Sequence, residues 1–193
     1  ALLAPIPSAS VNTTVIENRS VSEASAALIP GAALEAVSTP ATVKAIALVL
    51  PGGKADSFEP AVSSQLTAAR MRPFARSLAR AGKGRGLAVS MLHYRYRGWN
   101  GDDASPTVDA RWAMEEIRRT HGGIPAVLIG HSMGGRTSLR IADDPSVVGV
   151  VALAPWLPGD EPVGHLGGVR ALIAPGNLDF VTSPSASRRF AQR

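Results

Sequence analysis

A glycine-serine-glycine pattern in the middle of the chain places one serine where it could act as a nucleophile. Gly130, Ser132 and Gly134 alternate with other residues directly after the short apolar run 126–129. The residues that follow suit a helix, so the pattern predicts a sharp strand-to-helix turn with Ser132 at its tip. Glycine is needed on both sides because side chains there would collide in so tight a turn.

A serine that attacks a carbonyl group needs N–H donors for the negative charge that develops on the carbonyl oxygen. The N-terminus of the expected helix directs backbone N–H groups at this point, and Met133 carries the first candidate donor. Gly53, in the segment Pro51-Gly52-Gly53 after another apolar run, carries the second, with Lys54 as the neighbouring alternative. Glycine lets the backbone approach a substrate closely, although an ordinary Pro-Gly turn has the same sequence.

Composition excludes several other kinds of site. The 193 residues contain no cysteine, which excludes a disulfide scaffold, a cysteine-ligated metal and a cysteine nucleophile. Hydrophobic residues make up 45% and charged residues 18%, which excludes a wholly disordered chain. The longest apolar runs, 45–50 and 147–153, have the length of buried strands and are far too short to span a membrane. We therefore expect a cytoplasmic protein with no membrane partner.

Positive charge is concentrated after the first 43 residues. That first segment holds one arginine and three glutamates, a net charge of −2. Since the whole chain has a net charge of +5, residues 44–193 carry +7. Many of the basic residues lie between Arg70 and Arg85. Apolar residues at near-helical spacing separate them, as on a solvated helix face, and no recognised nucleic-acid motif accompanies them. We expect no nucleic-acid partner.

The chain changes character at residue 44. Residues 1–43 show no sustained period, so we expect an irregular segment there with one or two edge strands at most, such as 13–16. From residue 44 onward, strand-like and helix-like segments alternate, which predicts an α/β fold with a doubly wound, mostly parallel sheet. The expected strands are 45–50, 87–96, 126–129, 147–153 and 169–174, and the expected helices are 60–82, interrupted at Pro73, 106–120, 133–142 and 185–192.

From residue 44 to the end, the sequence resembles the α/β-hydrolases, and in particular the compact hydrolases common in high-GC bacteria. The resemblance rests on an ordered set of segments: 51–53, 71–76, 96–101, 109–113, 130–135 and 152–157. It implies a serine hydrolase that cleaves carboxylic ester or related acyl bonds through an acyl-Ser132 intermediate, with no metal and no organic cofactor. The family usually has histidine before the two glycines of the first loop, and Pro51 stands there in this chain.

The resemblance also implies an acidic residue after the nucleophile, which would hold the imidazole of a histidine base in one tautomer. Asp179, beyond the expected strand 169–174, stands where the family places this acid. Asp160, beyond the preceding strand, is the alternative. Few residues separate these two strands, so we expect no lid, an open site and a small-molecule acyl substrate.

No histidine stands where the resemblance places the base, beyond Asp179. The four histidines all precede that residue, and they are His93, His121, His131 and His165. Only 14 residues follow Asp179, whereas the family has a further strand, a loop with histidine and a last helix. We therefore expect residues 44–193 to be an incomplete α/β-hydrolase domain that lacks the last strand and helix, with its base beyond Arg193. The alternative is a hydrolase-like protein that binds a ligand or a partner without catalysis.

Overall fold

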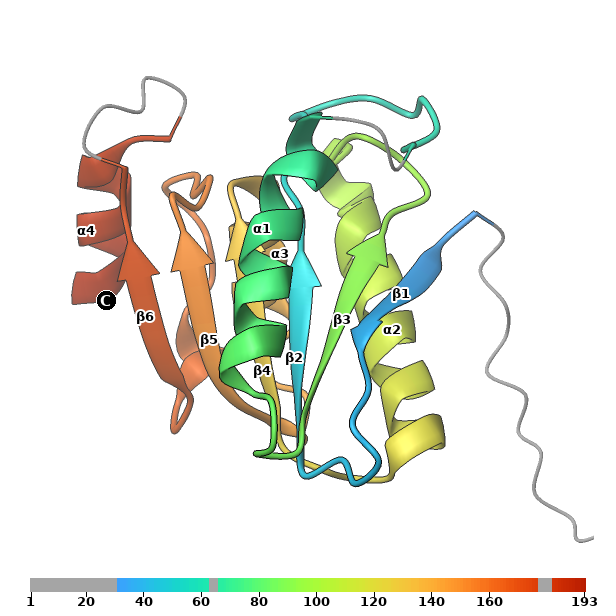
Figure 1. Ribbon diagram of the computed structural model, residues 1–193. Helices are drawn as coiled ribbons and strands as arrows, with labels where there is room; N and C mark the ends of the chain where they lie inside the picture. The colour runs from blue at the N-terminus through green and yellow to red at the C-terminus, as the bar shows by residue number, and fades with distance from the viewer. Residues whose placement is uncertain (1–30, 63–65, 177–181) are drawn as a thin grey trace, which may run out of the picture.

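One sheet of six strands runs through the structure, which is a computed structural model that describes residues 31–62, 66–176 and 182–193 (Figure 1). The strands are β1 (Ala33–Ser38), β2 (Ala45–Leu50), β3 (Leu87–His93), β4 (Ala126–His131), β5 (Val147–Leu153) and β6 (Arg170–Ala174). Their order in the sheet is β1-β3-β2-β4-β5-β6. All neighbouring pairs are parallel except β1 and β3, which are antiparallel. The predicted doubly wound, mostly parallel sheet is confirmed.

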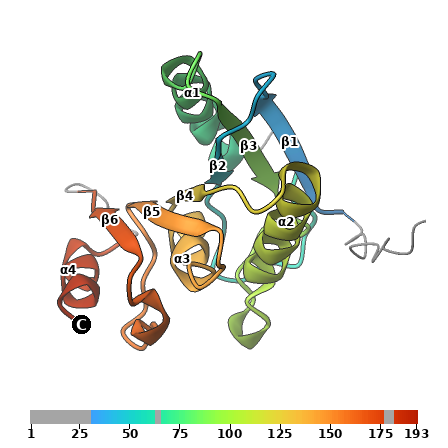
Figure 2. The same cartoon turned by 90° about the horizontal axis from the view of Figure 1, so that it is seen from below.

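Helices cover both faces of this sheet. They are α1 (Leu66–Ala81), α2 (Ser105–His121), α3 (Met133–Arg140) and α4 (Pro184–Gln192). Figure 2 shows α1 on one face and the other three on the opposite face. Successive side chains of β2 point to opposite faces of the sheet. Ile46 and Leu48 pack in the core with α2 and α3, and Ala47 and Val49 pack with α1. A strand buried on both faces is apolar at every position, which is the continuous pattern seen in the sequence.

Helix α1 differs from its prediction in two ways. It begins at Leu66, and Ala61, within the predicted helix, lies outside any helix and donates its N–H to the Arg95 carbonyl oxygen at 2.9 Å. The expected interruption at Pro73 is wrong, because α1 continues through this residue. Pro73 lies on the exposed side of the helix, as does Ala69 four residues earlier, so solvent can satisfy the carbonyl group that loses its N–H partner.

Strand β1 lies in the N-terminal segment and forms one edge of the sheet. Its register places Ala33 beside His93 and Glu35 beside Met91. The edge strand suggested by the sequence near 13–16 lies outside the described residues. Within the described part of the chain, no helix is long and apolar enough to cross a membrane.

A buried ion pair fastens α2 to the loop that follows β3. The side chain of Asp109 is fully buried, and its two oxygens accept from Arg95, at 2.8 Å from the backbone N–H and 2.5 Å from Nε. Burial raises the pKa of the Asp109 carboxyl above its ordinary value, although the hydrogen bonds from Arg95 oppose this effect. The pair fixes the path of the chain from β3 into the loop that contains Trp99.

We predict that Asp109→Ala destabilises the fold strongly. The substitution leaves an arginine and a backbone N–H without their buried acceptor, which costs about 3 kcal/mol of unfolding free energy. Asp143→Ala is the control, because Asp143 pairs with Arg111 on the surface, where such a pair contributes roughly 0.5 kcal/mol. Urea denaturation followed by circular dichroism measures both values. Equal losses for the two variants would contradict the role given to the buried pair.

Candidate functional site

Ser132 adopts a strained backbone conformation between the end of β4 and the start of α3. Its dihedral angles are φ 55° and ψ −116°, a region that costs about 1–3 kcal/mol for a residue with a side chain. Backbone hydrogen bonds with the end of the neighbouring strand β5 and with the segment that follows it hold Ser132 there. The Ser132 N–H donates to the Leu153 carbonyl oxygen at 3.0 Å, and the Ser132 carbonyl oxygen accepts from the Trp156 N–H at 3.1 Å. The serine is therefore fixed at the tip of a sharp strand-to-helix turn.

The two glycines of the motif lie where the backbone leaves no room for a side chain. A Cβ atom added to Gly130 would lie 2.1 Å from the Gly134 carbonyl oxygen. One added to Gly134 would lie 2.1 Å from the carbonyl oxygen of Leu50, the last residue of β2. The start of α3 is thus pressed against the end of β2, and only glycine permits this approach.

The loop after β2 reaches Ser132 directly. Leu50 is in register with Gly130, so the chain leaves β2 beside the strand-to-helix turn. A Cβ atom on Gly52 would lie 3.3 Å from the Ser132 Cβ, and one on Gly53 would lie 2.5 Å from the Met133 Cε. The structure therefore brings Gly53 and Met133 together beside the serine.

Both of these residues can present a backbone N–H to a bound carbonyl oxygen. Met133 is the first residue of α3, so its N–H has no acceptor within the helix. The loop that carries Gly53 is held by the next residue, since the Lys54 N–H donates to the Arg97 carbonyl oxygen at 2.8 Å and the Lys54 carbonyl oxygen accepts from the Trp99 N–H at 3.0 Å. These bonds occupy Lys54 and leave Gly53 as the candidate donor.

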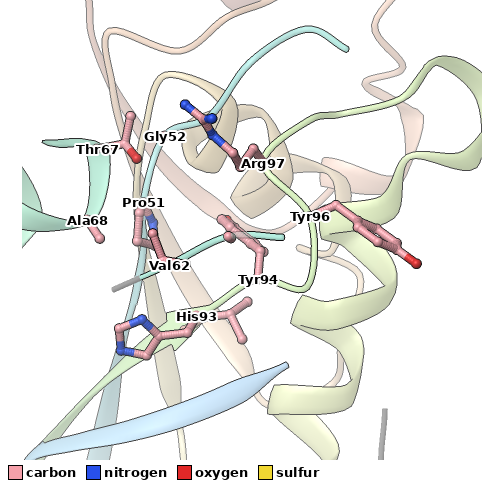
Figure 3. Close-up of a pocket in the computed structure, with 11 residues that line it drawn as sticks. Pro51, Gly52, Val62, Thr67, Ala68, His93, Tyr94, Tyr96 and Arg97 are labelled. Atoms are coloured by element: carbon pink, nitrogen blue, oxygen red, sulfur yellow. The ribbon is translucent and has the colours of Figure 1, made fainter. Parts of the chain in front are cut away.

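A small pocket opens beside the same loop (Figure 3). Its volume is about 20 Å³, enough for about one water-sized group. Pro51 and Gly52 form one wall, Val62 and Ala68 line it from the side of α1, and Tyr94 lines it from the chain beyond β3. The walls are largely apolar, so the pocket suits a methyl-sized group.

His93 lines this pocket, whereas His165 and His121 lie elsewhere. His93 Nε2 is 2.7 Å from Glu35 Oε2, and Glu35 also accepts from Arg72 at 2.8 Å. Burial raises the pKa of the Glu35 carboxyl, but its hydrogen bonds with these two partners outweigh burial and lower the pKa below its ordinary value.

His165 Nε2 lies 2.8 Å from the carbonyl oxygen of Leu139, near the far end of α3 from Ser132. His121 ends α2 and lies near the start of β4, whose other end leads to Ser132.

The fourth histidine, His131, precedes the serine in sequence. Its Nδ1 atom is buried, and a Cβ atom added to Gly52 would lie 3.3 Å from it. The ring therefore packs against the loop after β2.

The two candidate acids differ in what the structure shows of them. Asp179 lies outside the described residues, in the segment that follows β6. Asp160 is exposed in the loop between β5 and β6. In the described ranges, no three histidine, aspartate or glutamate side chains gather in a group that could hold a metal ion.

Sequence reasoning did not identify a buried arginine in α3, the helix that begins directly after Ser132. The Arg136 side chain, on the first turn of α3, is 8% exposed, and its Nε donates to Glu161 Oε2 at 2.7 Å. The rings of Trp99 and Trp156 lie against its guanidinium group. Both tryptophans stand in segments that carried the family resemblance, but no local spacing connects them with an arginine far from each in sequence.

We predict that Gly134→Ala disrupts this turn. The added methyl group meets backbone atoms of β2 rather than a flexible side chain, so we expect a loss of about 3 kcal/mol of unfolding free energy. Gly123→Ala is the matched control, because no atom lies within 4 Å of its added Cβ, and we expect a change within about 0.5 kcal/mol. Urea denaturation compares the two variants. A well-tolerated Gly134→Ala would contradict the close approach of α3 and β2.

Comparison with known proteins agrees with this architecture. A family model described as the alpha/beta hydrolase family matches residues 47–193. No curated protein matches the chain. Similar solved structures include an alpha-beta serine hydrolase homologue from Coxiella burnetii, with 15% identity and a TM-score of 0.60 over 84% of this chain and 75% of that one.

A second similar structure is a serine hydrolase without lid from Xanthomonas campestris, with 19% identity and a TM-score of 0.53 over 83% of this chain and 72% of that one. At these identities the two structures support the fold alone. The family model spans most of the chain, including the strand-to-helix turn and the loop after β2, and the chain therefore belongs to the α/β-hydrolase family.

Proposed function

We propose that this protein is a serine hydrolase that cleaves carboxylic ester or related acyl bonds through an acyl-Ser132 intermediate. The observation that carries the proposal is the strained conformation of Ser132 at the N-terminus of α3, with the Gly53 loop against it. Such strain persists only where the surrounding structure imposes it, and it often serves a mechanism. In the proposal, it holds the hydroxyl group beside the backbone N–H groups of Met133 and Gly53.

The proposed reaction has two steps. The Ser132 Oγ attacks the carbonyl carbon of the substrate, and a base accepts the hydroxyl proton. The N–H groups of Met133 and Gly53 stabilise the oxyanion of the tetrahedral intermediate. The bond to the leaving alcohol then breaks, and the alcohol takes up the proton. A water molecule attacks the acyl carbon in turn, which releases the carboxylic acid and restores the Ser132 hydroxyl.

The base in this proposal is a histidine imidazole that Asp179 orients. A carboxylate that accepts from one ring nitrogen holds the other nitrogen ready to accept the serine proton, and it stabilises the imidazolium ion that forms. The reaction as written needs no metal ion and no organic cofactor. Asp179 is assigned this role by its place in the chain after β6.

Two observations support a small acyl group in the substrate. The segment between β5 and β6 contains one short 3-10 helix, η2 (Gly164–Leu166). It contains no α-helix that could cover the site. The pocket beside Gly52 has room for about one water-sized group. The similar Xanthomonas protein is likewise described as lacking a lid. We therefore propose an open site that prefers short acyl chains.

A fluorophosphonate probe tests the assignment of the nucleophile on the complete gene product. We expect covalent labelling of Ser132, which peptide mass spectrometry locates, and Ser132→Ala should abolish it. Ser77→Ala is the control, because Ser77 lies exposed on α1, where it accepts from Arg80, and this variant should label normally. Equal labelling of the Ser132→Ala variant would refute the assignment. A wild-type protein that resists the probe would favour a hydrolase-like protein that binds without catalysis.

Hydrolysis of p-nitrophenyl esters of increasing chain length tests the substrate class. We expect the highest kcat/KM for the acetyl ester and a fall for chains much longer than butyryl, because the pocket accepts little more than one methyl-sized group. Ser132→Ala should reduce kcat by at least roughly 10⁴-fold. A maximum at long chains would contradict the small open site.

A further inference from the structure

The guanidinium group of Arg136 lies between two indole rings. Its Cζ atom is 3.7 Å from the centre of the Trp99 ring and 4.8 Å from the centre of the Trp156 ring. The two indoles meet edge to face, with ring centres 6.3 Å apart and an interplanar angle of 81°. A cation held against two aromatic faces in a desolvated position interacts strongly with both. Arg136 therefore ties together the loops that carry the two tryptophans.

Trp99 is connected through its backbone to the loop that carries the candidate oxyanion donor Gly53. The Trp99 N–H donates to the Lys54 carbonyl oxygen at 3.0 Å, and Lys54 directly follows Gly53. The chain beyond Trp99 is held as well, because its carbonyl oxygen accepts from the Ser105 N–H at the start of α2, at 3.0 Å. A shift of the Trp99 ring would thus move the backbone beside the Gly53 N–H.

Trp156 is connected through its backbone to the nucleophile. Its N–H donates to the Ser132 carbonyl oxygen at 3.1 Å, one of the bonds that hold the strained turn. Arg136 donates its own backbone N–H to the same oxygen at 3.2 Å. The guanidinium group therefore contacts both tryptophans: Trp156, whose backbone holds Ser132, and Trp99, whose backbone holds the loop of Gly53.

The orientation of Arg136 is itself fixed by Glu161. This carboxylate is 1% exposed, and its two oxygens accept from Arg136 and from Arg140. The Glu161 carbonyl oxygen accepts from the Arg193 side chain, which links the end of the chain to the same cluster. A buried ion pair contributes little net stability but holds its members in one geometry, which suits a positioning role.

We propose that Arg136 is a positioning residue that sets the distance between the Ser132 hydroxyl and the Gly53 N–H by stacking between Trp99 and Trp156. The inference rests on the proposed function, in which these two groups act on the same carbonyl. Arg136 itself contacts neither the substrate nor the reacting atoms. The planar guanidinium lies over the Trp99 ring, reaches the Trp156 ring and still donates through Nε to Glu161, whereas a lysine ammonium keeps the charge but lacks the planar surface that stacks on an indole.

The first test is the kinetics of Arg136→Lys, which keeps the positive charge opposite Glu161. We expect kcat for an acetyl ester to fall by about 10- to 100-fold while KM changes by less than about 2-fold, because the donor geometry matters mainly once the oxyanion forms. Affinity for a trifluoromethyl ketone, which forms a tetrahedral adduct with the serine, should fall by the same factor. Rates are compared at a temperature at which circular dichroism shows each variant fully folded.

The second test does not depend on activity. Amide hydrogen exchange at Lys54 and Trp156 reports whether the backbone hydrogen bonds beside Gly53 and Ser132 stay formed, because both N–H groups are hydrogen-bonded in the structure. We expect exchange at both positions to be at least about 10-fold faster in Arg136→Lys. Arg111→Lys is the matched control, an exposed arginine that pairs with Asp143, and it should leave both the exchange and kcat unchanged.

The outcomes separate this inference from the proposed function. Failure of the fluorophosphonate probe to label Ser132 would refute the hydrolase, whatever the exchange rates are. Unchanged exchange at Lys54 and Trp156 in Arg136→Lys would overturn the positioning role, even in an active enzyme. So would a rise in KM at constant kcat, or a fall in kcat with no loss of ketone affinity. Faster exchange at both positions together with parallel losses in kcat and ketone affinity would establish it.

Discussion

The site depends on one close approach, between the backbone of Gly134 and the end of β2. With no side chain at this position, α3 starts directly above the carbonyl groups of Leu50 and Pro51. The same approach brings the loop after β2 to within van der Waals range of Ser132 and Met133. A helix displaced by the volume of one methyl group would separate the serine from the loop that faces it, and neither would then act on a common group.

The strain at Ser132 is supported from several directions. The end of β5 and the segment after it hold its N–H and its carbonyl oxygen, and within α3 the buried Thr137 and Ser138 hydroxyl groups donate to carbonyl oxygens of the preceding turn. The Arg136 cluster lies on the other side of the same helix. A conformation that costs about 1–3 kcal/mol is thus held by contacts from the end of β5 and the residues that follow it, as is common at functional sites.

Much of the fold was predictable because buried parallel strands have a distinctive sequence. The runs that became β2, β4 and β5 were recognisable as continuous apolar segments between turns. The strand β1 was not, because it is only partly buried and its pairing with β3 joins residues far apart in the chain. The continuation of α1 through Pro73 was also unpredictable, because it depends on that residue facing solvent rather than a neighbouring element. Local propensity does not encode which side of a helix will be covered.

Ser132 could be placed at the tip of a tight turn from the sequence alone, because every requirement lies within the five residues from Gly130 to Gly134 and the strand before them. It also indicated the glycine loop after β2 as a partner. How these pieces meet depends on the tertiary fold, since Gly53 follows β2 and Met133 follows β4, two strands that are adjacent in the sheet but distant in the chain. The stacking of Trp99, Arg136 and Trp156 arises in the same way. No periodic pattern records such contacts, because packing between loops is set by the folded shape and not by residue spacing.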